Sequence, residues 1–173
     1  MEDDLPIKVV FLGENYVGKT CLINKYITGE FKESHLITTS TYSKKTINFN
    51  GKDYIFDIWD TPGYEKYRPL AKLFMKGAKI IVLVYDITKK KSFLELDFFL
   101  DTILERLGNE VFLILVGNKM DLYENEEIRE EDGKKFAKII KARFSLVSAK
   151  EDNNIWNIFF ENALKEYIQL REK

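Results

Sequence analysis

Residues 13–20 read Gly-Glu-Asn-Tyr-Val-Gly-Lys-Thr and match the pattern G-x-x-x-x-G-K-S/T. They follow directly on residues 5–12 (LPIKVVFL), an apolar run typical of a buried strand, and a helix is predicted over residues 19–28. Between a strand and a helix, the glycines let backbone N–H groups wrap a phosphate, and the positive end of the helix points at it. Lys19 would reach the β- and γ-phosphates, and the Thr20 hydroxyl would bind Mg²⁺. The loop therefore indicates a nucleotide phosphate and does not identify the base.

A second motif, D-x-x-G, is formed by residues 60–63 (DTPG) at the end of a predicted strand over residues 53–60. The Asp60 carboxylate is expected to face the phosphate-binding loop from a neighbouring strand, where it can hold Mg²⁺ through water. Gly63 offers an N–H that can approach the γ-phosphate, because no side chain blocks it. Asp60 is therefore predicted to contact the metal, and Gly63 is predicted to contact the γ-phosphate.

A further metal ligand is expected in the polar segment 33–41 (ESHLITTST). Thr38 lies 18 residues after Thr20 and 22 before Asp60, and both separations suit a threonine that binds Mg²⁺ only in the triphosphate state. Thr39 is the nearest alternative. The residues predicted to surround the phosphates and the metal are Asn15, Tyr16, Val17, Gly18, Lys19, Thr20, Cys21, Thr38, Asp60 and Gly63.

Two polar segments that follow later predicted strands indicate the base. The Asp121 carboxylate can accept hydrogen bonds from N1–H and N2–H of guanine, a pair of donors that adenine lacks. Asn118 can bond the N7 edge of the ring, and the stem of Lys119 can lie along its plane. In the segment Ser148-Ala149-Lys150, the Ala149 N–H can donate to guanine O6. The sequence therefore predicts guanine.

Strand and helix patterns alternate along the chain. A hairpin is predicted at Asn50-Gly51, where two β-rich segments meet. Uninterrupted apolar strands alternating with amphipathic helices predict a mostly parallel sheet covered on both faces. We expect one doubly wound α/β domain of the P-loop NTPase type over residues 1–173, with a six-stranded sheet, one antiparallel hairpin strand and about five helices. The predicted strands are 5–12, 41–49, 53–60, 79–86, 111–117 and 143–147, and the predicted helices are 19–28, 65–77, 91–107, 130–141 and 153–170.

The amino-acid composition limits the classes of partner and the cellular setting that can be expected. The 27 Lys and Arg residues nearly balance the 28 Asp and Glu residues, for a net charge of −1, which argues against nucleic acid or a bilayer as a general electrostatic partner. Cys21 is the single cysteine, so an internal disulfide is impossible and a reducing, cytoplasmic setting is expected. The acidic N-terminus does not resemble a secretory signal, and a run of about 20 apolar residues is absent. We expect a soluble monomer.

In order and spacing, these motifs resemble the Ras superfamily of small GTPases, and most closely its Rab branch. The Rab-like segments are 54–61 (YIFDIWDT), 83–88 (LVYDIT) and 115–122 (LVGNKMDL). The resemblance implies GTP and GDP with Mg²⁺ as cofactors, GTP hydrolysis, and regulation of vesicle traffic. It implies effector proteins, a guanine-nucleotide exchange factor and a GTPase-activating protein as partners. It also implies that Phe31 packs edge-on against the guanine.

Three departures from the Rab pattern matter. Tyr64 stands where the family has the glutamine that orients the attacking water, and Pro62 stands where the family has an alanine. The predicted catalytic residues are therefore Lys19, Gly63 and Tyr64, and we expect GTP hydrolysis to be weak. Residues 37–42 (ITTSTY) differ from the usual Rab switch sequence. The cysteine tail that carries the Rab lipid is absent, so attachment to the cytosolic face of a membrane would require a lipidated natural C-terminus.

Other functions remain alternatives. Tyr64 also favours a non-hydrolysing pseudo-GTPase that recruits partners constitutively, and another branch of the superfamily is a further alternative. A P-loop kinase or ATPase would need a lid and an acceptor site, for which the chain lacks room. In the switch interpretation, GTP orders the loops around Thr38 and Gly63 for effectors. Candidate effector contacts are Phe49, Trp59 and Tyr67.

Overall fold

Six strands form one sheet in the computed structural model, which describes residues 5–33, 41–151 and 154–173. The order across the sheet is β2-β3-β1-β4-β5-β6. The strands are β1 (Ile7–Leu12), β2 (Thr41–Phe49), β3 (Lys52–Asp60), β4 (Ile80–Asp86), β5 (Phe112–Asn118) and β6 (Arg143–Leu146). Only β2 and β3 pair in antiparallel fashion, and the other neighbours are parallel. The predicted mixed sheet with one antiparallel hairpin strand is confirmed.

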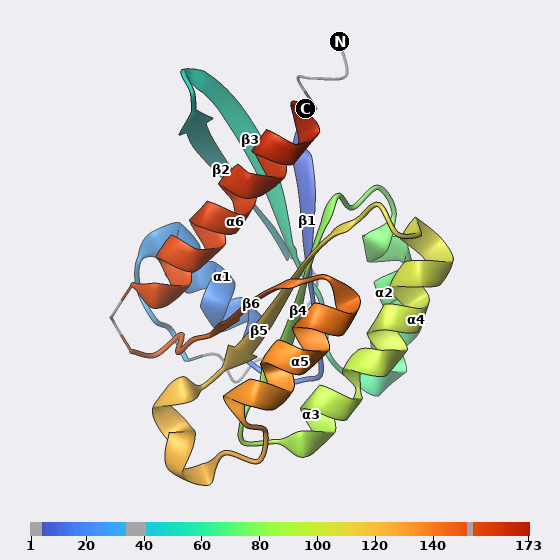
Figure 1. Ribbon diagram of the computed structural model, residues 1–173, viewed down its shortest axis with the longest axis vertical. Coiled ribbons are helices and arrows are strands. Elements are labelled where there is room, and N and C mark those ends of the chain that lie inside the picture. The colour runs from blue at the N-terminus through green and yellow to red at the C-terminus, as the bar shows by residue number, and fades with distance from the viewer. Residues whose placement is uncertain (1–4, 34–40, 152–153) are drawn as a thin grey trace.

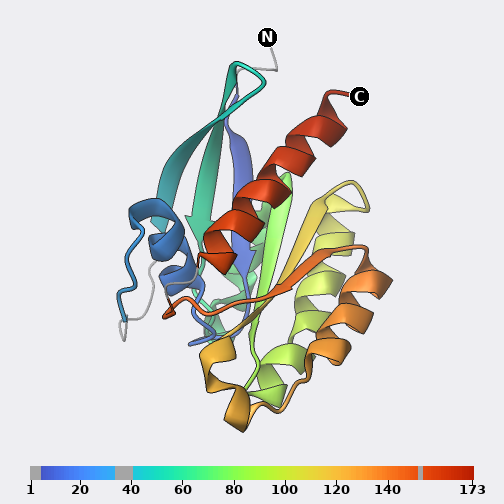
Figure 2. The same cartoon turned by 60° about the vertical axis from the view of Figure 1, so that its left-hand side comes forward.

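Helices cover both faces of the sheet, with α1 and α6 on one face and α2, α4 and α5 on the other (Figures 1 and 2). The helices are α1 (Lys19–Thr28), α2 (Arg68–Met75), α3 (Lys90–Leu94), α4 (Leu96–Leu107), α5 (Glu130–Ile140) and α6 (Ile155–Arg171). Side chains alternate along β4, so that Val82 and Val84 face the core under α1 and α6, while Leu83 and Tyr85 face the other core. All seven residues of β4 are buried, which is why this strand is apolar throughout.

Helix boundaries are where sequence and structure differ. The single helix predicted over residues 91–107 is divided into α3 and α4 at Glu95, whose carboxylate pairs with Arg68 of α2. The segment 65–77 contains a 3-10 helix, η2 (Glu65–Tyr67), followed by the shorter α2, and the 3-10 helix η3 (Met120–Asn125) was not predicted. Among the described residues, none of the helices is long and apolar enough to cross a bilayer.

The strand order also explains where the site lies. After β1 the chain moves to one side of the sheet, to β2 and β3, and after β3 it moves to the other side, to β4. Ligands of doubly wound sheets bind at the carboxyl ends of the strands, where the direction of winding changes. The loop between β1 and α1 lies at this point. A Cβ added to Gly13 would lie 2.2 Å from the Val84 carbonyl oxygen of β4, so the loop can pass this close to the sheet only as glycine.

Candidate nucleotide site

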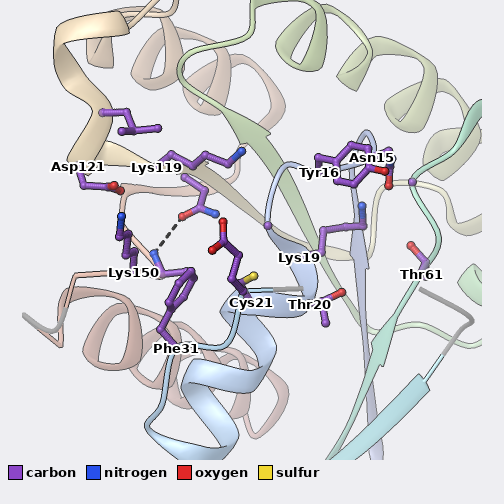
Figure 3. A pocket seen from close by; sticks show the side chains of 16 residues that line it. Asn15, Tyr16, Lys19, Thr20, Cys21, Phe31, Thr61, Lys119, Asp121 and Lys150 are labelled. Carbon is purple, nitrogen blue, oxygen red and sulfur yellow. Dashed lines mark hydrogen bonds between the residues drawn. The ribbon is translucent and has the colours of Figure 1, made fainter. Parts of the chain in front are cut away.

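The carboxyl ends of the strands surround a cavity of about 340 Å³. Figure 3 shows two groups of side chains around it: Lys19, Thr20 and Thr61 at one end, and Lys119 and Asp121 at the other. The lining residues are Asn15, Tyr16, Gly18, Lys19, Thr20, Cys21, Phe31, Glu33, Thr61, Gly63, Asn118, Lys119, Asp121, Leu122, Ala149 and Lys150. Residues that are more than 130 positions apart in the sequence thus line one cavity, with the phosphate-binding loop at one end and the two predicted base segments at the other.

Lys19 provides a buried ammonium group at the loop end. Its Nζ donates hydrogen bonds of 2.9 Å to the carbonyl oxygens of Gly13 and Glu14, and its side chain is almost wholly buried. Burial lowers the pKa of Lys19 to about 8, an effect that the nearby carboxylates of Asp60 and Glu14 only partly offset. The ammonium therefore stays mostly charged at neutral pH, and a phosphate bound beside it would raise its pKa again.

Thr20 and Asp60 meet beside this ammonium. The Thr20 hydroxyl donates a 2.5 Å hydrogen bond to Oδ2 of Asp60. Oδ1 of Asp60 is buried and has no hydrogen-bond partner among the described residues. Burial raises the pKa of the Asp60 carboxyl, against the opposing effects of Thr20 and Lys19. A hydroxyl and a carboxylate with an unpaired oxygen fit Mg²⁺, which takes a few protein oxygens together with water and phosphate.

The start of the segment after β3 is held close to the loop. Thr61 Oγ1 donates a 2.6 Å hydrogen bond to the carbonyl oxygen of Phe11 in β1. A Cβ added to Gly63 would lie 2.5 Å from the backbone N of Asn15 and from the carbonyl carbon of Glu14. Gly63 is therefore next to the loop, and any larger residue would push the two segments apart. Thr38 and Thr39, the alternative metal ligands, lie outside the described residues.

At the other end, Ser148 orients the carboxylate of Asp121. Ser148 Oγ donates a 2.6 Å hydrogen bond to Asp121 Oδ1 and accepts bonds from the backbone N–H groups of Lys150 (3.2 Å) and Glu151 (3.0 Å). Ser148 is buried and does not line the cavity itself. Ser148 thus holds the carboxylate of Asp121, which lines the cavity, and a contact of Ser148 with a base stays a prediction.

Asn118 connects the two ends of the site. Its Nδ2 donates a 2.9 Å hydrogen bond to the Val17 carbonyl oxygen in the phosphate-binding loop, and its Oδ1 accepts a 3.1 Å bond from the Ala149 N–H. A Cβ on Gly18 would lie 2.2 Å from the same Nδ2. The Ala149 N–H, predicted to donate to guanine O6, is thus engaged by Asn118. Val17 does not line the cavity, and only its carbonyl joins the site, because its side chain is buried in the core.

A family comparison agrees with this geometry. The family model described as "Ras family" matches residues 8–169. The chain belongs to the Ras family. This Ras-family protein is 35% identical over 161 residues to Ras-related protein SEC4 of Saccharomyces cerevisiae, a match that covers 92% of the chain and 74% of the relative. It is 33% identical over 174 residues to human Ras-related protein Rab-30, covering 99% and 86%.

A third relative, Ras-related protein RabJ of Dictyostelium discoideum, is 35% identical over 159 residues, which cover 91% of the chain and 62% of RabJ. The Rab names of two of these relatives, Rab-30 and RabJ, confirm the Rab branch that residues 54–61, 83–88 and 115–122 predicted. The Ras-family protein is accordingly a small GTPase of the Rab branch, and proteins of this family bind guanine nucleotides and hydrolyse GTP.

Sequence reasoning missed one residue that supports the site in this Ras-family protein. Asp86 is fully buried, and its Oδ2 lies 2.7 Å from Nζ of Lys119, while its Oδ1 accepts hydrogen bonds from the N–H and hydroxyl of Thr88. Asp86 thus holds the stem of Lys119 along one side of the cavity. The signal was present in the sequence, since a carboxylate ends an otherwise apolar strand, beside Asn118 in the next strand. Glu33, Thr61 and Leu122 also line the cavity without having been predicted.

Tyr64, which stands at the position of the family's glutamine, meets Tyr16 at the loop end. The hydroxyl groups of Tyr16 and Tyr64 are 2.7 Å apart, and their rings pack edge to face with centroids 6.0 Å apart. This hydrogen bond lowers the pKa of Tyr16 and raises the pKa of Tyr64 relative to an ordinary tyrosine. Tyr64 is therefore directed at Tyr16 in this Ras-family protein, and it does not line the cavity.

Proposed function

We propose that the chain acts as a single-domain guanine-nucleotide switch that binds GTP or GDP with Mg²⁺ in this cavity. The observation that carries the proposal is the arrangement of an oriented carboxylate, Asp121, at one end and of Lys19, Thr20 and Asp60 at the other. Asp121 would accept the guanine donors, and Lys19 would neutralise phosphate charge. When bound through Thr20 and Asp60, Mg²⁺ would neutralise charge on the phosphate oxygens.

We further propose that GTP hydrolysis is slow because Tyr64 occupies the position of the glutamine. A glutamine amide offers a donor and an acceptor that together orient a water molecule, whereas a phenol has a single hydroxyl. In addition, the hydroxyl of Tyr64 is already hydrogen-bonded to Tyr16. Lys19 and Gly63 remain in place to contact the phosphates, so binding and hydrolysis are separable.

The substitution Tyr64→Gln tests this proposal. We expect single-turnover hydrolysis of bound GTP to accelerate by roughly tenfold or more, because an amide can then orient the attacking water. Phosphate release from preloaded protein measures the rate, and Tyr64→Phe serves as the matched control that removes the phenol without adding an amide. If Tyr64→Gln hydrolyses GTP no faster than Tyr64→Phe, the assignment of this position is wrong.

The nucleotide that copurifies with the protein separates a switch from a constitutive binding module. Protein purified without added nucleotide is denatured, and the released nucleotide is identified by chromatography. Mostly GDP supports a switch that completes its hydrolytic cycle, and mostly GTP supports a pseudo-GTPase that recruits partners without turnover. An adenine nucleotide would contradict both and would favour the kinase or ATPase alternative.

The proposed partners are effectors in vesicle traffic, an exchange factor and a GTPase-activating protein. An aromatic surface beside the site supports an effector contact: Tyr42 is more than half exposed and stacks on Trp59 with centroids 5.4 Å apart, and Phe74 packs against the same ring. Phe49, a predicted member of this surface, lies at the opposite end of the β2–β3 hairpin, about 20 Å away along the strands. We therefore place the effector contact around Tyr42 and Trp59.

A further inference from the structure

The segment that follows β3 is attached to the phosphate-binding loop outside the cavity. The attachment is the hydrogen bond of 2.7 Å between the hydroxyl groups of Tyr16 and Tyr64. Tyr16 lines the nucleotide cavity, and both tyrosines line a neighbouring hollow of about 550 Å³. The pair therefore stands at the border between the loop end of the nucleotide cavity and the surface next to it.

The backbone of Tyr16 adopts a conformation that is unusual for a tyrosine. Tyr16 has a φ of 63°, a left-handed conformation that is uncommon for a bulky residue and natural for glycine. The phosphates are wrapped by backbone N–H groups of such a loop, so that role requires no phenol at this position. A strained residue persists when its surroundings hold it, and strain of this kind gathers at functional sites.

The segment 61–64 is fixed at both of its ends. Thr61 is bonded to the Phe11 carbonyl oxygen of β1, and Tyr64 is bonded to Tyr16. Gly63 lies between these attachments, in direct contact with the loop backbone. The Tyr16–Tyr64 hydrogen bond therefore opposes movement of Gly63 away from the loop, a movement that would loosen contacts around a bound phosphate.

We propose that Tyr16 is a positioning residue that holds Tyr64 against the phosphate-binding loop, and that this tyrosine pair slows the release of bound nucleotide. The inference rests on the proposed binding of guanine nucleotide in the cavity. The same bond keeps the Tyr64 hydroxyl occupied at the loop surface. Tyr16 thus acts through Tyr64 and the segment that Tyr64 anchors, rather than through its own contact with the phosphates.

A double-mutant cycle on nucleotide release tests the pair. Tyr16→Phe, Tyr64→Phe and the double variant are loaded with a fluorescent GDP analogue and Mg²⁺, and release is followed after adding excess GDP. Each single variant should release the analogue about two- to fivefold faster, because one exposed hydrogen bond is lost while both rings remain. The double variant should be no faster than the faster single variant, since both changes remove the same bond.

Tyr123→Phe is the matched control, because Tyr123 is an exposed tyrosine that does not line the cavity. Its release rate should equal that of the unchanged protein. The proposed role of the tyrosine pair would be overturned if both single variants released the analogue at the wild-type rate. It would also be overturned if the two effects on the release rate multiplied in the double variant. Failure of the unchanged protein to bind the analogue would instead overturn the proposed function itself.

A further variant, Tyr16→Gly, tests the role of the Tyr16 side chain independently of the phenylalanine variants. Tyr16→Gly removes the phenol and also relieves the positive φ, so the loop backbone itself is not strained in this variant. It should nevertheless release the fluorescent GDP analogue faster, at the rate of Tyr16→Phe or above. Release from Tyr16→Gly that is slower than from the unchanged protein would contradict the proposed role of Tyr16.

Discussion

Asp121→Asn should lower the affinity for GDP by about 100- to 1,000-fold. The carboxylate is expected to accept two hydrogen bonds from guanine, and hydrogen bonds to charged groups contribute about 1.5–3 kcal/mol each. An asparagine amide presents N–H donors to the guanine donors, so part of the recognition becomes repulsive. The side chain keeps its size and its carbonyl can still accept the bond from Ser148, so the effect reports on recognition rather than on packing. Isothermal titration of nucleotide-free protein with GDP and Mg²⁺ measures the change.

The matched control for Asp121→Asn is Asp101→Asn, which removes one carboxylate from the exposed face of α4. Its affinity for GDP should equal that of the unchanged protein. Inosine diphosphate, which lacks the exocyclic amine of guanine, should bind the unchanged protein more weakly than GDP. Equal affinities for GDP and inosine diphosphate would argue that the N2–H₂ group is not recognised by Asp121.

Lys19→Met should lower the affinity for GDP and GTP by about 100-fold or more, with little change in the stability of the nucleotide-free fold. The ammonium is buried beside the loop, where a contact with phosphate would be poorly screened by water. Removing it relieves a burial penalty, visible in the lowered pKa of Lys19, but leaves the carbonyl oxygens of Gly13 and Glu14 without their donor. These opposing terms should leave the free energy of unfolding within about 1 kcal/mol of its original value.

Urea unfolding and nucleotide titration of the same Lys19→Met protein separate the two effects. Lys138→Met, on the exposed face of α5, is the matched control and should leave both quantities unchanged. A large loss of stability in nucleotide-free Lys19→Met would mean that the ammonium supports the loop itself. Undiminished nucleotide affinity would mean that Lys19 does not contact the phosphates.

Much of the fold could be predicted because local chemistry determines it. The β2–β3 hairpin was predicted to within a residue, since Asn50 and Gly51 both adopt positive φ, a combination that this dipeptide tolerates best. The apolar strands β4 and β5 were predicted because strands buried on both faces carry few polar residues. The division between α3 and α4 at Glu95 was not predicted, and the ion pair that Glu95 makes there with Arg68 depends on a contact with another helix.

The location of the site was predictable, but the contacts within it were not. Motifs at the ends of parallel strands must converge at one edge of the sheet, which brought Lys19, Asn118 and Asp121 together. The bonds between Ser148 and Asp121, between Asp86 and Lys119, and between Tyr16 and Tyr64 join residues that are distant in sequence. Periodicity within a segment gives no information about which polar atoms meet across the site.

The uptake of a fluorescent GDP analogue by purified, nucleotide-stripped protein with Mg²⁺ restored tests the central claim most directly. The proposed guanine-nucleotide site predicts saturable binding of one analogue per chain, displaced by GDP or GTP and not by ATP. Absence of saturable binding, or displacement by ATP as effective as that by GDP, would contradict it.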